Sequence, residues 1–174
     1  MTDEAIPRTV RRVTFLTAAG TALWLGAIFL APWLAAKGAS GPARVLYALF
    51  RPVCHQIADR CFMLDGHPLA VCGRCLGIYV GFAAGLVLFP LVRGFRSPSL
   101  PRPLTFFLAV LPLAVDGVAG VLGLWKSPIG VRFVTGLVWG TVLPFYFVTG
   151  LADLALSRRK RRAALALEKS GDPK

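Results

Sequence analysis

The sequence lacks cysteine and histidine everywhere except in one short segment. All four cysteines and both histidines fall within residues 54–75 of the 174-residue chain. The sequence also has no phosphate-binding loop, no Ser-His-Asp arrangement and no dinucleotide-binding motif. These absences argue against a nucleotide-binding protein and a serine hydrolase. They also confine any chemistry that uses cysteine or histidine to a single segment.

Acidic residues are also scarce, since eight Asp and Glu stand against twenty Lys and Arg and give a formal net charge of +12. The basic residues lie between and beyond long apolar runs, and no basic stretch is interleaved with aromatic residues. This pattern argues against a nucleic-acid partner and favours contact with a lipid bilayer. The hydrophobic fraction of 56% and the mean hydropathy of +0.65 are typical of a membrane protein.

Four apolar runs are long enough to cross a bilayer as helices of 1.5 Å rise per residue. The sequence therefore predicts an all-α, polytopic membrane protein, a four-helix transmembrane bundle with spans at residues 13–36, 68–92, 103–125 and 131–156. The membrane domain covers residues 13–156, between an N-terminal segment 1–12 and a basic tail 157–174. Residues 37–67 form a Cys/His loop that runs into residues 72–75, and its apolar stretch 44–53 predicts a short interfacial or re-entrant helix.

The distribution of Lys and Arg predicts the orientation of the bundle. One side of the membrane would hold Arg8, Arg11, Arg12, Arg93, Arg96, Arg102 and the run Arg158, Arg159, Lys160, Arg161 and Arg162. The other side would hold the smaller set Lys37, Arg44, Arg51, Arg60, Lys126 and Arg132. Because positive charge is retained inside, we expect a multi-pass protein of the inner (cytoplasmic) membrane with both termini in the cytoplasm and the Cys/His loop outside.

Small residues recur along the second span at every fourth position. They are Gly73, Gly77, Gly81 and Gly85. Such small-xxx-small spacing lets another helix backbone approach closely within a membrane. The pattern predicts a tight helix–helix contact, either inside the bundle or as a helix–helix oligomer.

The thiols are placed for chemistry rather than scattered. The motif Cys72-Gly-Arg-Cys75 stands at the start of the second span, where the helix N-terminus and Arg74 both favour thiolate. One interpretation is a zinc site with Cys54, Cys72 and Cys75 as ligands and a fourth ligand from His55, Cys61 or His67.

Two other interpretations of the cysteines remain open. In the first, the protein is a membrane thiol–disulfide oxidoreductase, with Cys72/Cys75 as one pair, Cys54/Cys61 as the other and a quinone as electron acceptor. Its architecture is similar to that of quinone-linked enzymes that make disulfides, which is an analogy of fold alone. In the second, the cysteines form structural disulfides in a small transporter or assembly subunit.

One carboxylate lies inside an apolar run. Asp116 falls near the bilayer centre when the residues of the third span are counted, and a charge there is costly unless it is paired. Arg74 or Arg132 could pair with it if the helices bring them together. Asp116 is therefore a functional candidate.

Taken together, these residues resemble a known family. The string C-H-Q…C-x-R-C-x-G-x-Y-x-G, within residues 45–150, is similar to the signature of the domain-of-unknown-function 2085 family of predicted bacterial and archaeal integral membrane proteins. The matching positions are Cys54, His55, Gln56, Arg60, Cys72, Arg74, Cys75, Gly77, Tyr79, Gly81 and the pair Asp116-Gly117.

The resemblance bears on the ligand set. Members of the family often carry Ser where this chain has Cys61, so the resemblance implies a site of three cysteines and His55 rather than two disulfide pairs. It implies no established activity. Gln56, Arg60 and Tyr79 would then form a polar network behind the ligands.

Overall fold

The computed structural model describes residues 5–95 and 100–169, and this part of the chain is almost entirely helical. Its elements are α1 (Ala5–Ala36), α2 (Ser40–Phe50), the 3-10 turn Ala58–Arg60, β1 (Met63–Leu64), β2 (His67–Pro68), α3 (Gly73–Arg93), α4 (Pro103–Val121) and α5 (Ile129–Lys169). Parts of the predicted termini, residues 1–4 and 170–174, lie outside the described residues, as does Arg96.

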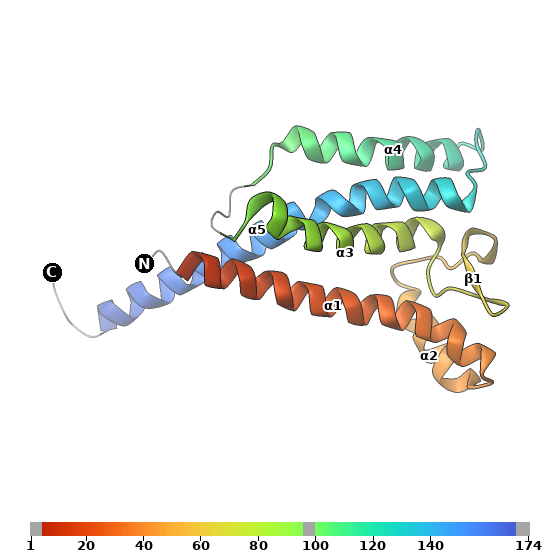
Figure 1. The fold of residues 1–174 in the computed structure, drawn as a ribbon, viewed down its shortest axis with the longest axis horizontal. Helices are drawn as coiled ribbons and strands as arrows, with labels where there is room; N and C mark the ends of the chain where they lie inside the picture. Colours follow the sequence, from red (N-terminus) through yellow and green to blue (C-terminus); the bar gives the residue numbers. More distant parts are fainter. Residues whose placement is uncertain (1–4, 96–99, 170–174) are drawn as a thin grey trace.

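Four of these helices are long and apolar enough to cross a membrane: α1, α3, α4 and α5. They run side by side, with α2 and the β1–β2 hairpin at the end opposite the start of α1 and the end of α5 (Figure 1). Large apolar side chains on their outer faces are exposed, such as Leu23 at 77% and Leu91 at 78%. Lipid is the solvent in which such faces are stable. The prediction of an all-α, polytopic membrane protein is confirmed.

The tightest contact in the bundle joins α3 to α5 through glycines. A methyl group added at Gly77 or Gly81 would overlap the carbonyl oxygen of Phe133 or Leu137, respectively. From the other side, Gly140 of α5 lies against the backbone of Ile78. The glycine spacing therefore serves a contact within the chain, and an oligomer through the same face would require α5 to leave it.

The outer helices are held by aromatic side chains. In α4, Phe106 lies with its ring centroid 5.5 Å from that of Tyr146 and 6.2 Å from that of Trp139, both in α5. In α1, Trp24 packs edge-on against Phe50 of α2, with ring centroids 4.8 Å apart. These large contacts attach α4 and α1 without bringing backbones together.

Several predicted span boundaries differ from the structure, beginning with α1, which starts at Ala5 rather than at Val13. Helix α3 begins at Gly73 rather than at Pro68, because residues 63–68 form an antiparallel hairpin in which Met63 pairs with Pro68. The hairpin turns at Asp65 and Gly66, whose φ angles of 48° and 80° suit a two-residue Asp-Gly turn. Helix α4 ends at Val121 rather than at Trp125, just before Gly123 with φ of 72°.

The last helix is longer than its predicted span. It runs for 41 residues and carries the basic run of residues 158–162 on the same continuous helix. The short helix expected within residues 44–53 is present as α2, which ends at Phe50. The basic tail is thus a helical extension of the bundle over its described length.

Candidate metal centre

Three cysteine side chains meet at the start of α3. Cys72 is the N-cap residue of that helix, Cys75 lies in its first turn, and Cys54 follows the end of α2. Their three Sγ atoms all lie within 4.8 Å of one another. The backbone N–H of Cys72 donates a hydrogen bond of 3.2 Å to the Cys54 sulfur. Segments 18 residues apart in the sequence are thereby joined at one group of thiols.

The local environment favours thiolate at Cys72. Hydrogen bonds from the thiols of Cys54 and Cys75 lower the pKa of the Cys72 thiol well below its ordinary value, against the opposing effect of burial. A thiolate is the form that binds a metal or attacks a disulfide. The sequence predicted thiolate here from the helix N-terminus and Arg74, whereas in the structure the main cause is the neighbouring thiols and it acts at Cys72.

A polar scaffold holds the Cys54 segment in place. The Gln56 side chain donates through Nε2 to the Tyr47 carbonyl at 2.7 Å and to the Ala70 carbonyl at 2.8 Å. The Tyr47 hydroxyl in turn donates to the Pro68 carbonyl at 2.6 Å. Gln56 therefore ties the loop to α2 and to the residues just before Cys72. The sequence suggested Gln56 for such a network, but nothing in it singled out Tyr47.

The remaining Cys and His residues lie apart from this group. Cys61 is buried, donates its thiol hydrogen to the Ile57 carbonyl at 3.2 Å, and has its pKa raised to about 11 chiefly by burial. His55 is exposed, and His67 belongs to β2. Among the described residues, the group of close ligand atoms contains neither histidine. The fourth ligand expected from His55 is therefore not in place, and that assignment stays a prediction.

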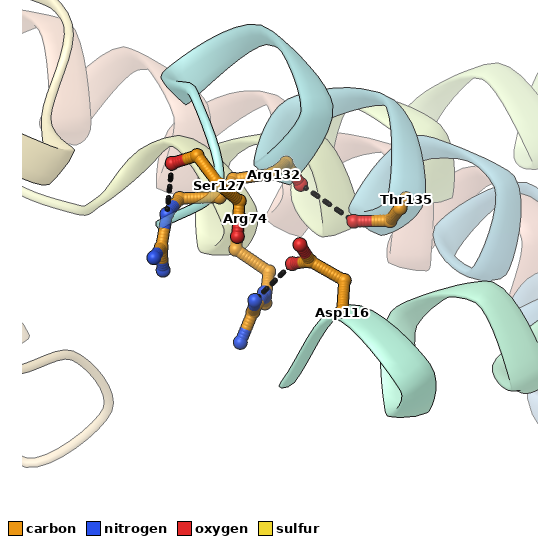
Figure 2. A network of polar contacts seen from close by, with 5 residues as sticks. All are labelled: Arg74, Asp116, Ser127, Arg132 and Thr135. Atoms are coloured by element: carbon orange, nitrogen blue, oxygen red, sulfur yellow. Dashed lines mark hydrogen bonds and ion pairs between the residues drawn. The ribbon is translucent and has the colours of Figure 1, made fainter. Parts of the chain in front are cut away.

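Arg74, between the two cysteines of the motif, turns toward α4 and pairs with Asp116 (Figure 2). Asp116 is buried, and it stands five residues before the end of α4, or about 8 Å along the helix axis. The helix is shorter than the predicted third span, so Asp116 lies nearer to its end than the sequence count indicated, and its depth in the bilayer stays a prediction. The buried carboxylate of Asp116 needed a positively charged partner, and Arg74, one of the two candidates from the sequence, is that partner.

Tyr79 and Arg60 occupy different surroundings. Tyr79 packs against Trp24 of α1, with ring centroids 5.8 Å apart, one helical turn beyond Cys75. Arg60 is exposed at the end of the 3-10 turn. The predicted polar network behind the ligands is therefore carried by Gln56, whereas Tyr79 makes a ring contact.

A cavity of about 300 Å³ opens beside the thiols. Its lining includes the three cysteines, His55, Gln56 and three arginines, Arg60, Arg74 and Arg132. Arg132 is only 9% exposed and comes from the start of α5. The sequence indicated Arg132 only as a partner for Asp116. More than fifty residues separate it from Cys72 in the sequence, so its position beside the thiols could not be predicted.

Comparison with known proteins places the chain in a family. A family model described as a predicted membrane protein, DUF2085, matches residues 54–146. An uncharacterized protein of Methanocaldococcus jannaschii is 36% identical over 126 residues, which cover 70% of this chain and 81% of the relative. An uncharacterized protein of Methanothermobacter thermautotrophicus is 36% identical over 92 residues, which cover 52% of this chain and 80% of the relative. No solved structure gives a significant match. The chain therefore belongs to the DUF2085 family of membrane proteins.

Proposed function

We propose that the protein binds one zinc ion through Cys54, Cys72 and Cys75 at the loop end of the membrane bundle. The observation that supports this is the mutual approach of the three Sγ atoms to within 4.8 Å. In tetrahedral zinc sites the Zn–S distance of about 2.3 Å sets neighbouring sulfurs about 3.8 Å apart. Small side-chain rotations would bring the three sulfurs to that spacing.

The three-thiol set leaves one position of a tetrahedral metal for another ligand. Three protein ligands with an open fourth position are typical of sites where water or substrate binds the metal, whereas structural zinc sites are closed by four protein ligands. The cavity beside the thiols gives access to this position. An exchangeable metal site in a membrane protein is the function that this geometry supports best.

Metal analysis of the purified protein tests the proposal. We expect about one zinc ion per chain, and loss of that ion in Cys54→Ser, Cys72→Ser and Cys75→Ser. Cys61→Ser is the matched control, because this buried thiol lies outside the group and should leave the zinc content unchanged. Wild-type protein that takes up no zinc under reducing conditions would rule the proposal out.

His55→Ala tests the fourth ligand. Because three cysteine sulfurs already lie together, we expect this variant to keep its zinc. His55 lines the same cavity, so a change of side-chain rotamer is the route by which it would reach the metal. Complete loss of zinc in His55→Ala would instead support the four-ligand set of Cys54, His55, Cys72 and Cys75 predicted from the sequence.

A thiol–disulfide oxidoreductase is the second candidate, since three close thiols also suit disulfide exchange. The pairing predicted for it changes, because Cys54 lies with Cys72 and Cys75 and apart from Cys61. A thiol with a pKa of about 11 is a poor nucleophile at neutral pH, so Cys61 would not be the second shuttle residue. Zinc-free protein whose Cys72/Cys75 pair cycles with a quinone would favour this function. Permanent disulfides with no effect of Cys→Ser changes would leave a structural role.

We also propose that the thiol end of the bundle faces the outside of the inner membrane. The support is the basic count, because the start of α1 and the basic run on α5 lie at the end opposite the hairpin (Figure 1). Reporter domains fused after Arg162 should be active only as cytoplasmic reporters. Periplasmic activity of such a fusion would reverse the orientation.

A further inference from the structure

We propose that the cavity beside the three thiols binds a small oxyanion, a carboxylate or phosphate group, through Arg132 and Arg60. This inference rests on the proposed function, because it names the class of ligand that would meet the open position of the metal. Its own support is the charge and hydrogen-bonding state of the cavity wall.

Arg132 is the first part of that support. Its Nε donates to the Ser127 carbonyl at 3.1 Å, and its guanidinium is directed away from the Asp116 carboxylate (Figure 2). Among the described residues, the two terminal nitrogens of Arg132 have no hydrogen-bond or ion-pair partner. Arg132 is about nine-tenths buried as a residue and borders the cavity, so an acceptor bound there would be well placed to pair with those donors. An oxyanion in the cavity supplies that acceptor.

The balance of charge is the second part. Of the three arginines that line the cavity, Arg74 is neutralised by Asp116, and no acidic side chain of the described residues lines the wall. Three thiolates with Zn²⁺ carry a net charge of about −1, whereas Arg60 and Arg132 together carry +2. The loaded site is thus short of one negative charge, which a monoanion restores.

The ligand class follows from the donors. Planar guanidinium groups present paired N–H donors that match the two oxygens of a carboxylate or a phosphate. The volume of about 300 Å³ is at the lower end of small-molecule sites, so it suits one such group rather than a large substrate. The polar wall and the neighbouring N-terminus of α3 favour negative charge at the same place.

Anion binding to the intact protein in phosphatidylcholine nanodiscs tests the inference. Isothermal titration with inorganic phosphate and with acetate should show one site for at least one of them. Arg132→Gln and Arg60→Gln should each weaken this binding about tenfold or more, because each removes a charged donor. The matched control is Arg51→Gln, an exposed arginine near the same end that does not line the cavity.

The outcomes separate this inference from the metal proposal when zinc is measured in the same samples. Zinc-loaded protein that binds neither anion overturns the inference alone, as does equal binding by Arg60→Gln and Arg51→Gln. Anion binding that Arg60→Gln weakens in zinc-free protein supports the inference and counts against the metal. Because Arg60 is exposed, its variant should fold even if Arg132→Gln does not.

A last arm distinguishes a soluble anion from a lipid headgroup. Phosphatidylglycerol added to the nanodiscs should weaken phosphate binding to the wild-type protein by competition if a headgroup is the natural ligand. Unchanged phosphate affinity points to a soluble anion that enters from the aqueous side. Both results support an oxyanion site, and they differ only in where its ligand comes from.

Discussion

The two sides of α5 are packed by different means. On the α3 side, backbone lies against backbone where glycines of both helices interlock, as at Gly77, Gly81 and Gly140. On the α4 side, the rings of Phe106, Trp139 and Tyr146 fill the space. Figure 1 shows α5 between its two partners. Interlocked backbones allow little sliding, whereas rings can adjust by changing rotamer.

This difference assigns separate roles to the helices. Cys72, Cys75 and Arg132 all stand at one end of the interlocked α3–α5 pair, so their relative positions are fixed by backbone contact. Helix α4 contributes one charged group, Asp116, which reaches α3 through Arg74. A group of thiols on a rigid helix pair, supported from outside by one ion pair, is an arrangement that keeps side chains preorganised.

The largest expected effect is on the α3–α5 side. Gly81→Leu would force a side chain into the backbone of Leu137 and Thr141, so we expect no folded, monodisperse protein in detergent. Gly150→Leu is the control on α5, because a side chain at that position meets nothing within 4 Å. Size-exclusion chromatography and thermal unfolding measure the difference. Equal behaviour of the two variants would remove the distinction between the sides of α5.

The next effect concerns the link between α3 and α4. Asp116→Leu leaves the Arg74 guanidinium without its partner and should reduce the free energy of unfolding by about 3 kcal/mol. Thermal unfolding should then occur about 10 °C lower. The double variant Arg74→Met/Asp116→Leu should recover most of the loss. Asp153→Asn, at an exposed position of α5, should change the melting temperature little. A stabilised Asp116→Leu protein would mean that the ion pair is dispensable.

A smaller effect is expected from a change in the loop, which leaves both packing faces of α5 intact. Gln56→Ala removes the two hydrogen bonds to Tyr47 and Ala70 and should weaken zinc binding about tenfold, with a modest loss of stability. Gln56→Asn is the matched variant, since Asn tolerates the φ of 52° at this position but is shorter than Gln. Similar weakening in both variants assigns the effect to the lost hydrogen bonds. A defect confined to Ala would assign it to backbone strain.

The smallest effect is a pH dependence at Cys61. Because burial raises its pKa to about 11, this thiol stays protonated at neutral pH and should resist iodoacetamide until the pH approaches 11. In metal-free protein Cys72, whose pKa is lowered, should already react at pH 7. Mass spectrometry of the alkylated peptides measures both rates. In urea-unfolded protein the two thiols should react alike, and a fast Cys61 in the folded state would contradict the assignment.

The helices and the thiols were predictable from local patterns. Apolar runs and the four-residue spacing of glycine depend only on the helix period, so they indicated the spans and the close contact at Gly77 and Gly81. The position of Cys72 and Cys75 at a helix start followed from the apolar run behind them. These features depend on short stretches of sequence.

The details of the candidate site were hidden for a physical reason. Arg132 reaches the thiols through the packing of α5 on α3, and no local pattern reports the register between two helices. His55 adjoins Cys54 in sequence, but it does not belong to the group of close ligand atoms, and no sequence pattern indicated this. The hairpin could have been predicted from Asp65-Gly66, which is a strong two-residue turn signal. It was missed because the apolar residues from Pro68 onward were assigned to the second span.

The length of α5 has a mechanical consequence. At 1.5 Å per residue its 41 residues extend about 60 Å, roughly twice the hydrocarbon thickness of a bilayer. Arg132 and the basic run at residues 158–162 therefore lie near opposite ends of one continuous helix. A tilt of about 5° would displace the far end of this helix by about 5 Å. A change in the tilt of α5 at the thiol end would therefore also move the basic run.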